Sequence, residues 1–167
     1  GEFTWMGRGA LGRDDGRVAF FRRERLPLLA PVATEPPAGE IPAAILGALR
    51  EKGALFFSDL VGAARAPLRE VLDALWDLAW AGFVTNDTFG PVRALAWPRD
   101  GRVRPYRGTG SLIPAEAAGR WSLVSTPAAT PTERAHALAG SLLERYGVVT
   151  RECAATEGLP GGFSSVY

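Results

Sequence analysis

The chain has 167 residues, 47% of them hydrophobic and 22% charged, and its formal net charge at pH 7 is +1. This length and composition allow a buried core and are typical of a globular protein with one domain or two small ones, not of a disordered chain. There is no apolar run of about 18 residues for a membrane span and no signal-peptide pattern, so we expect a cytoplasmic protein with no membrane partner.

Residues 1–26 are predicted to form a β-hairpin element. Phe3-Thr-Trp-Met6 and Arg17-Val-Ala-Phe-Phe-Arg22 are short β-prone runs, and a Gly-rich stretch ending at Arg13-Asp-Asp-Gly16 joins them. The two aspartates of that stretch are typical turn residues, which we favour over metal ligands or an acid pair. An extended connector over residues 27–40 is indicated by four prolines, Pro27, Pro31, Pro36 and Pro37.

Residues 41–97 have the pattern of a winged helix-turn-helix. A first helix is predicted over residues 41–51, and a second over residues 59–64 with Ser58 as its N-cap. The third begins at Pro67 and carries apolar residues at three- and four-residue steps up to Gly82. Two strands, 83–85 and 92–96, are predicted to form the wing. A helical hairpin followed by an ordinary β-hairpin is the alternative interpretation.

The remaining residues are predicted to form a linker and a second helical unit. Residues 98–129 are rich in Arg, Pro and Gly without a clear period, which indicates a linker. Residues 130–167 repeat the helix order of the first winged-helix unit. Thr130 and Glu133 have capping-box spacing, and Thr150 is a candidate cap for the next helix. We interpret this part as a second winged helix truncated before its wing, and expect the chain to be a fragment of something longer. The predicted fold class is α+β.

The arginines are distributed unevenly along the chain. Residues 88–121 carry six arginines against two acidic residues, a net charge of +4, whereas residues 40–82 carry four basic and six acidic residues, a net charge of −2. Because phosphates attract cations, the candidate DNA contacts are placed in the wing and the segment after it. They combine charge, small polar donors and an aromatic ring: Asn86, Thr88, Arg93, Arg102, Arg104, Tyr106 and Arg107. A solvated arginine-rich loop is the alternative.

The third helix carries two tryptophans, Trp76 and Trp80, one turn apart. They are possible stacking or docking residues, since a base-stacking platform would use such rings. Packing against the wing or a neighbouring domain is the interpretation that we favour. The helix face opposite its apolar stripe carries three carboxylates, which repel phosphates, so groove reading by this helix is not expected.

No catalytic residue is predicted. The serines near the C-terminus and Cys153 have no obvious neighbouring base, and His136 lies beside the apolar stripe of a helix. One cysteine cannot form an internal disulfide, and one cysteine with one histidine is too few for a four-ligand zinc site. No phosphate-binding Gly-x-x-x-x-Gly-Lys-Ser/Thr motif and no DEAD-like box occurs. By itself the chain is therefore expected to hydrolyse no ATP and to hold no cofactor or metal.

Several stretches resemble the bacterial Lhr (large helicase-related) proteins, which are superfamily 2 ATP-dependent DNA helicases. They are residues 7–18 (GRGALGRDDGRV), 75–95 (LWDLAWAGFVTNDTFGPVRAL), 119–123 (GRWSL), 144–152 (ERYGVVTRE) and 158–163 (GLPGGF). The resemblance extends over nearly the whole chain and places it after two RecA-like motor domains, in the DEAD/H-associated region. It implies tandem winged helices with a β-rich element, similar to the AlkZ-type DNA glycosylases. It also implies a parent protein that moves 3′ to 5′ on single strands, uses ATP and Mg in its motor, and acts in DNA repair.

We therefore predict a nucleic-acid-binding accessory region of an ATP-dependent 3′–5′ DNA helicase. Its expected partners are DNA, single-stranded or duplex with a tail, and the RecA-like motor domains of the parent chain. One alternative is a protein–protein docking module that uses Trp76, Trp80 and the acidic helix face. Another is a winged-helix transcription regulator, which the missing basic recognition helix disfavours.

Overall fold

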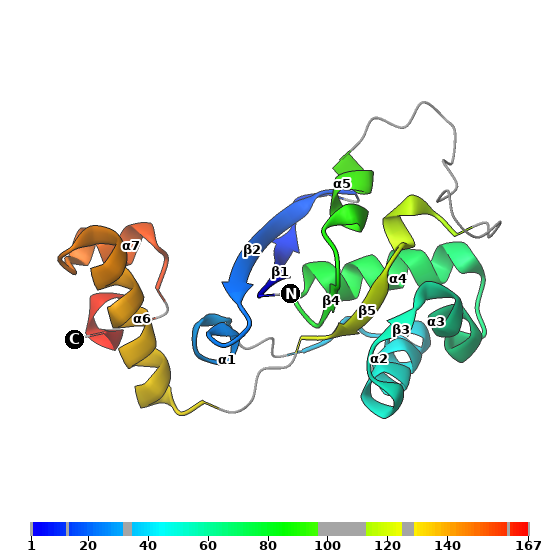
Figure 1. Ribbon diagram of the computed structural model, residues 1–167, viewed down its shortest axis with the longest axis horizontal. Coiled ribbons are helices and arrows are strands. Elements are labelled where there is room, and N and C mark those ends of the chain that lie inside the picture. The colour runs from blue at the N-terminus through cyan, green and yellow to red at the C-terminus, as the bar shows by residue number, and fades with distance from the viewer. Residues whose placement is uncertain are drawn as a thin grey trace. The chain divides into compact units, whose positions relative to one another are not determined.

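The computed structural model describes residues 2–12, 14–31, 35–96, 113–124, 129–159 and 161–166. The chain divides into two units, one formed by Gly1–Arg22 with Ala33–Val124 and the other by Arg23–Val32 with Ser125–Tyr167. Helices and strands are mixed and begin with the expected hairpin, so the α+β class is confirmed (Figure 1). No helix within the described ranges is long and apolar enough to cross a membrane.

The first unit begins with the predicted hairpin. Strand β1 (Phe3–Ala10) pairs antiparallel with β2 (Gly16–Arg22). The register runs from Phe3 opposite Arg22 to Gly7 opposite Val18, and then shifts before Ala10. The Gly-rich stretch therefore extends β1 by means of a bulge instead of ending it, because a bulge takes up the extra residue and keeps the two strands paired.

Three helices follow as the winged-helix pattern predicts. They are α2 (Glu40–Lys52), α3 (Phe57–Ala64) and α4 (Leu68–Trp80), with the short strand β3 (Leu55–Phe56) before α3. The predicted N-cap at Ser58 is wrong, because α3 already includes Ser58 in its first turn. The Asp59 carboxylate reaches back to accept a hydrogen bond of 3.2 Å from the Phe56 N–H, which starts the helix two residues earlier.

The wing differs from its prediction. Strand β4 (Val84–Asn86) is present, but residues 92–96 form helix α5 (Gly90–Ala96) and not a return strand. The partner of β4 is β5 (Arg120–Leu123), which lies inside the segment predicted as a linker and follows the short 3-10 helix η1 (Ala115–Ala117). These strands form an antiparallel sheet in the order β3-β5-β4.

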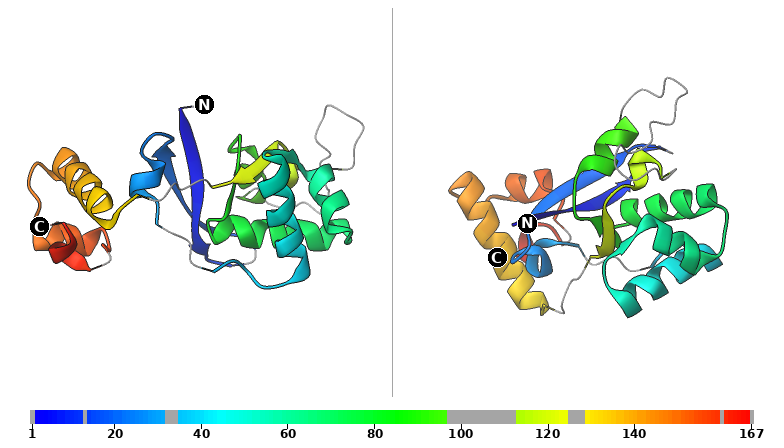
Figure 2. Two further views of the ribbon diagram at one scale, coloured as in Figure 1. Left: turned by 90° about the horizontal axis from the view of Figure 1, so that it is seen from below. Right: turned by 45° about the vertical axis from the view of Figure 1, so that its right-hand side comes forward.

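The hairpin packs against the end of α4 and against β4, as the views of Figure 2 show. Gly7 lies so close to α4 that a Cβ there would be 2.0 Å from the Ala79 carbonyl oxygen, and a Cβ on Gly16 would be 2.4 Å from the Trp80 ring. Both glycines are therefore needed for the close approach of strand to helix. The hairpin is an integral part of the first unit.

The second unit contains α6 (Pro131–Tyr146), α7 (Arg151–Thr156) and the 3-10 helix η2 (Gly162–Ser165). The Thr130 capping box is present, with Glu133 N–H donating to Thr130 Oγ1 at 3.2 Å and Thr130 N–H donating to the Glu133 carboxylate at 2.8 Å. Thr150 Oγ1 accepts from Cys153 N–H at 3.2 Å, as predicted for the cap of α7.

The second unit also includes part of the predicted extended connector. Residues Leu26–Leu29 form a short helix, α1, that packs on α6. Arg134 of α6 donates a hydrogen bond of 2.8 Å to the Pro27 carbonyl oxygen and another to that of Ala30. These long-range contacts hold the proline-rich segment in a helical turn, which the sequence pattern alone does not indicate.

Candidate nucleic-acid interface

Helix α4 occupies the position from which a winged helix usually reads a DNA groove. One side of it is covered by the protein itself, because the hairpin and the wing strands enclose its tryptophans. Trp76 and Trp80 are only 5% and 4% exposed. The Trp76 ring packs against Trp5 and Trp121, with centroids 6.3 and 5.4 Å away, and its Nε1 donates to the Glu116 carbonyl at 3.1 Å. Both rings are therefore almost wholly covered, and only an edge of Trp76 lines the hollow beside the helix.

The exposed side of α4 is acidic. Arg69 is paired with Asp73, with 3.2 Å between Arg69 Nε and the carboxylate. An open hollow of about 210 Å³ beside the helix is lined by four carboxylates and this one arginine, among other residues: Asp14, Asp73, Asp77, Glu116 and Arg69. The arginine of this lining is already paired with Asp73, so the described residues of the hollow give a phosphate backbone little attraction.

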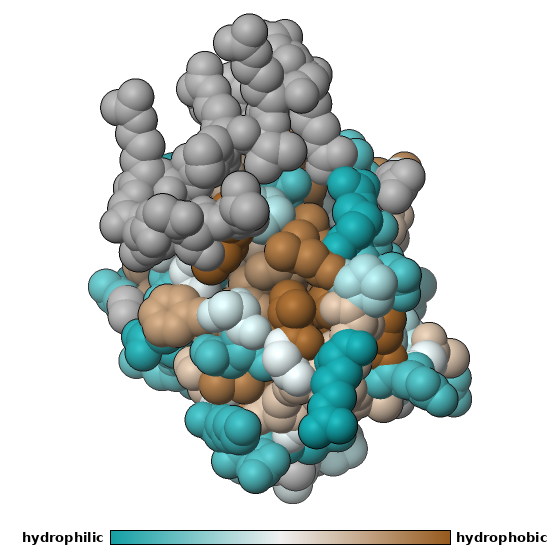
Figure 3. All heavy atoms as spheres, turned by 90° about the vertical axis from the view of Figure 1, so that its right-hand side faces the viewer, coloured by the Kyte–Doolittle hydropathy of each residue, from teal (hydrophilic) through white to brown (hydrophobic). Residues whose placement is uncertain are grey.

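The start of α4 is no more suited to DNA. Figure 3 faces the end of the first unit that carries α2, α3 and the beginning of α4, and hydrophobic side chains gather at its centre. Leu68 and Phe56 are 42% and 54% exposed in this part of the unit. The negative net charge of residues 40–82 led us to place the expected DNA contact away from the third helix. The acidic side of α4 and the apolar surface at its start both agree with that placement.

Asn86 and Thr88, two predicted DNA contacts, hold the start of the wing together. Asn86 is 4% exposed; its Nδ2 donates to the Ala118 carbonyl at 2.9 Å, and its Oδ1 accepts from Thr88 N–H at 2.9 Å and from the Thr88 hydroxyl at 3.2 Å. The Thr88 carbonyl in turn accepts from Trp5 Nε1 at 3.1 Å. Because Asn86 is buried and its amide is fully engaged within the fold, we give it a structural role. Thr88 is exposed, and its contact with DNA stays a prediction.

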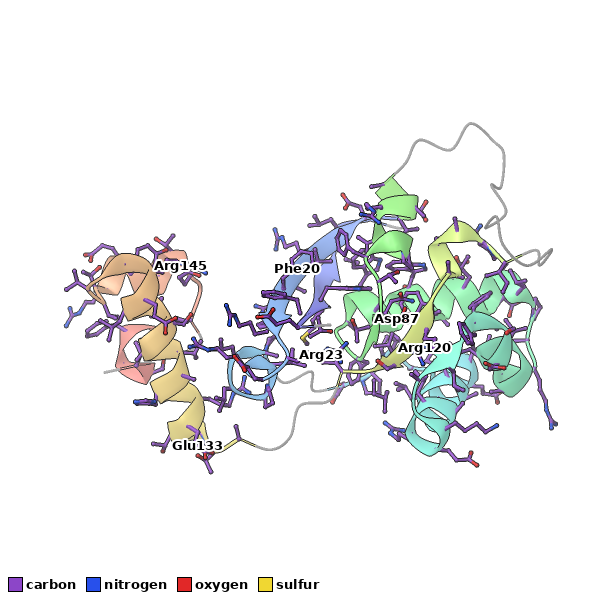
Figure 4. The ribbon with its side chains drawn as sticks, in the orientation of Figure 1. Phe20, Arg23, Asp87, Arg120, Glu133 and Arg145 are labelled. Atoms are coloured by element: carbon purple, nitrogen blue, oxygen red, sulfur yellow. The ribbon has the colours of Figure 1, made fainter. Side chains whose placement is uncertain are left out.

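A charged pair closes the same region. Arg120 N–H and Nε donate to the two carboxylate oxygens of Asp87 at 3.0 and 3.3 Å, and Figure 4 shows the two residues side by side at the ends of β5 and β4. The charge of Arg120 is thus largely compensated. Of the six arginines that made residues 88–121 basic, this one contributes little to attracting phosphates.

Arg93 remains as a candidate in the described part of the wing. It is exposed on α5, and no carboxylate within the described ranges pairs with it. The other predicted contacts, Arg102, Arg104, Tyr106 and Arg107, lie outside the described residues and stay predictions.

Other exposed cations of the first unit have no carboxylate partner in the part of the chain that the structure describes. They are Arg8, Arg17, Arg50, Lys52 and Arg65. The sequence did not indicate Arg8 and Arg17 as a pair, because they are nine positions apart and only the strand register brings them opposite each other. An alternation of basic and apolar residues near a predicted hairpin is the one signal that could have suggested it.

Nothing in the described residues suggests a catalytic or metal centre. They contain no group of three or more His, Cys, Asp or Glu side chains placed to hold a metal ion. His136 is exposed on α6, and Cys153 is half-buried with its Sγ 3.4 Å from the Thr150 hydroxyl.

Comparison with known proteins agrees with the resemblance noted in the sequence. Residues 128–167 match a family described as the winged-helix domain of the large helicase-related protein. The chain is 39% identical over 191 aligned positions, covering 100% of its length, to "Lhr helicase/ probable uracil glycosylase" of Mycolicibacterium smegmatis. It is 32% identical over 191 positions, covering 99% of its length, to "Lhr helicase/uracil glycosylase" of Escherichia coli. The chain spans 12% of the length of each of these relatives.

Proposed function

We propose that this Lhr-type chain is a nucleic-acid-binding accessory region of an ATP-dependent 3′–5′ DNA helicase that acts in DNA repair. The observation that carries the proposal is the similarity over the whole chain to two proteins named as helicases and uracil glycosylases. Helicases and uracil glycosylases both act on nucleic acid. In this proposal ATP, Mg and the catalytic residues belong to other parts of the longer protein, including RecA-like motor domains.

The proposed mode of binding is contact with the phosphate backbone. Since α4 is covered on one side and acidic on the other, it does not enter a groove. Exposed arginines attract DNA of any base sequence, because the phosphates they contact are the same at every position. Sequence-independent contact suits a region that holds DNA while a motor moves it. Arg93, and the arginines predicted after it, are the proposed contacts of the wing.

The structure bears differently on the two alternatives, a transcription regulator and a protein–protein docking module. A transcription regulator that reads a groove through its third helix is disfavoured by the covered α4. A docking module loses Trp76 and Trp80 as contact residues, since both are buried, but keeps the acidic hollow beside α4 as a surface for a basic partner. Absence of DNA binding would favour this alternative.

The test is a salt series of DNA binding. Fluorescent single-stranded, duplex and tailed-duplex DNA would be titrated with the 167-residue chain and with the Arg102→Ala, Arg104→Ala, Arg107→Ala triple variant, alone and combined with Arg93→Ala. We expect each lost phosphate contact to lower the slope of log K against log salt by about 0.7–0.9. The matched control, Arg50→Ala, Lys52→Ala, Arg65→Ala, also removes three cations and should keep the slope. No binding at low salt would contradict the proposal.

A further inference from the structure

We propose that Arg8 and Arg17, which lie opposite each other on the N-terminal hairpin, form a two-guanidinium site for a backbone phosphate of nucleic acid. The inference rests on the proposed DNA-binding function and adds a contact outside the wing.

The strand register brings these two residues together. Gly7 pairs with Val18 and Ala10 pairs with Gly16, so Arg8 and Gly9 together lie opposite Arg17. This arrangement is a β-bulge, and Gly9 adopts a φ of +106°, a conformation that few other residues accept. A bulge of this kind sets two residues against one on the partner strand, so Arg8 and Arg17 are neighbours across the pair. Two guanidinium groups can therefore reach one ligand.

The charges of this pair are not balanced by the hairpin. Arg8 and Arg17 are both exposed, and neither has a carboxylate partner in the described part of the chain. The hairpin's acidic residues are placed elsewhere: Glu2 pairs with Arg22 at 3.5 Å, Asp14 lines the hollow beside α4, and Asp15 accepts from Gly16 N–H at 2.8 Å. Like charges directly opposite each other are destabilising, and an anion between them removes this cost.

The site is held rigid from both sides along the strands. Gly7, next to Arg8, is packed on the Ala79 carbonyl, and Gly16, next to Arg17, is packed on the Trp80 ring. The backbone that carries both arginines is thus anchored to α4. A preorganised backbone loses little entropy when a ligand binds.

The chemistry selects a phosphate. A guanidinium presents parallel N–H donors that match two oxygens of a phosphate, and two such groups can bind one phosphodiester from two sides. Such a contact reads no base and depends on salt. It would add to the affinity for single-stranded and duplex DNA alike.

The test compares three variants in the 167-residue chain by anisotropy of fluorescent single-stranded and tailed-duplex DNA. For Arg8→Ala with Arg17→Ala we expect roughly 10-fold weaker binding near 0.1 M salt and a salt slope lower by about 0.7–0.9, as for the loss of one phosphate contact. Arg8→Lys with Arg17→Lys should keep most of the slope. Arg50→Ala with Lys52→Ala, which removes the same charge from the end of α2, should bind as the wild type does.

Each result of this comparison either supports or overturns the Arg8/Arg17 site. An equal loss in the two alanine pairs would mean a general effect of charge and would overturn the site. An unchanged Arg8/Arg17 variant, with binding lost in the triple variant of the wing segment, would overturn the site and leave the proposed function standing. No binding by the wild type would overturn both. Thermal melting without DNA provides the folding control, because relief of repulsion should leave the alanine pair at least as stable as the wild type.

Discussion

Gly7 of β1 lies directly on the carbonyl oxygen of Ala79 in α4, at a distance that leaves no room for a side chain. A Cβ at this position would be 2.0 Å from that oxygen, which belongs to helix backbone and cannot rotate away. The contact joins the N-terminal hairpin to the helix that would otherwise be free to enter a DNA groove. It thus links the architecture of the first unit to the way in which we expect the chain to meet DNA.

Gly7→Ala should therefore destabilise the first unit. Overpacking against backbone forces the strand and the helix apart, at an expected cost of about 2–3 kcal/mol. Urea unfolding followed by tryptophan fluorescence would measure it, since Trp5, Trp76 and Trp80 lie at this junction. Gly12→Ala is the control, because nothing lies within 4 Å of a Cβ there, and its effect should stay within about 0.5 kcal/mol. Equal unfolding midpoints would refute the close packing.

Asn86→Ala should behave as a loss of structure and not as a loss of a DNA contact. The change removes three hydrogen bonds at a residue that is 4% exposed and leaves the half-buried Ala118 carbonyl without this partner, for an expected loss of about 2–3 kcal/mol. Arg120→Ala, which breaks only an exposed ion pair with Asp87, should cost at most about 1 kcal/mol. Chemical denaturation gives both values. A folded Asn86→Ala variant that binds DNA more weakly than the wild type would restore Asn86 as a contact.

The parts of the fold that could be predicted are those with local signals. The capping box at Thr130, the proline that starts α4 and the alternation of the hairpin each depend on residues a few positions apart. The partner of β4 could not be predicted, because Val84 pairs with Leu123, far along the chain. Residues 92–96 are a short apolar run, and such a run fits a strand as well as a helix.

The candidate site shows the same limit. The charge count directed attention away from α4, and the carboxylates beside that helix agree with it, because the sum of charges along a segment needs no knowledge of contacts. Asn86 was expected to contact DNA from the wing, but it is buried and bonded to Ala118, whose position follows from β5. Arg8 and Arg17 were missed because strand register decides which side chains are neighbours.

Arg134→Ala should release α1 from α6 in the second unit. Arg134 donates to the carbonyls of Pro27, which is half-buried, and Ala30, which is buried, and without it both acceptors lose charge-assisted bonds, for an expected loss of about 2–3 kcal/mol. Faster hydrogen exchange and faster tryptic cleavage near Arg25 would report the release. Glu144→Ala is the control, since its ion pair with Arg25 is exposed and should contribute at most about 1 kcal/mol. Unchanged exchange in α1 would contradict the role of Arg134.

The capping box of α6 should make the second unit sensitive to acid. The Thr130 N–H and hydroxyl both donate to the Glu133 carboxylate, which holds the pKa of that group below its usual value. Since the folded pKa is the lower one, this stabilisation is present above the unfolded pKa of about 4.3 and is lost as the pH falls through the folded value. Far-UV circular dichroism between about pH 5 and 3 would follow the loss of helix.

Glu133→Gln is the matching variant, because a glutamine can still cap the helix but does not titrate. It should show less change than the wild type over the same range. Hydrogen bonds also lower the pKa values of Glu152 and Glu157, and these two groups would contribute equally to the acid sensitivity of the wild type and of Glu133→Gln. Identical acid profiles would mean that the box contributes nothing to the pH dependence.

Arg65→Gly should stabilise the first unit. Arg65 ends α3 in the left-handed conformation with φ 50°, and its N–H donates to the Val61 carbonyl at 3.0 Å. A glycine adopts this conformation without the steric cost of a Cβ, so we expect a gain of about 0.5–1 kcal/mol in urea unfolding. Arg50→Gly, in an ordinary helical position of α2, removes the same side chain and should instead cost about 1 kcal/mol. A loss of stability in Arg65→Gly would mean that the Arg65 side chain stabilises the first unit. DNA binding weakened as strongly as by loss of Arg8 and Arg17 would mean that Arg65 contacts DNA.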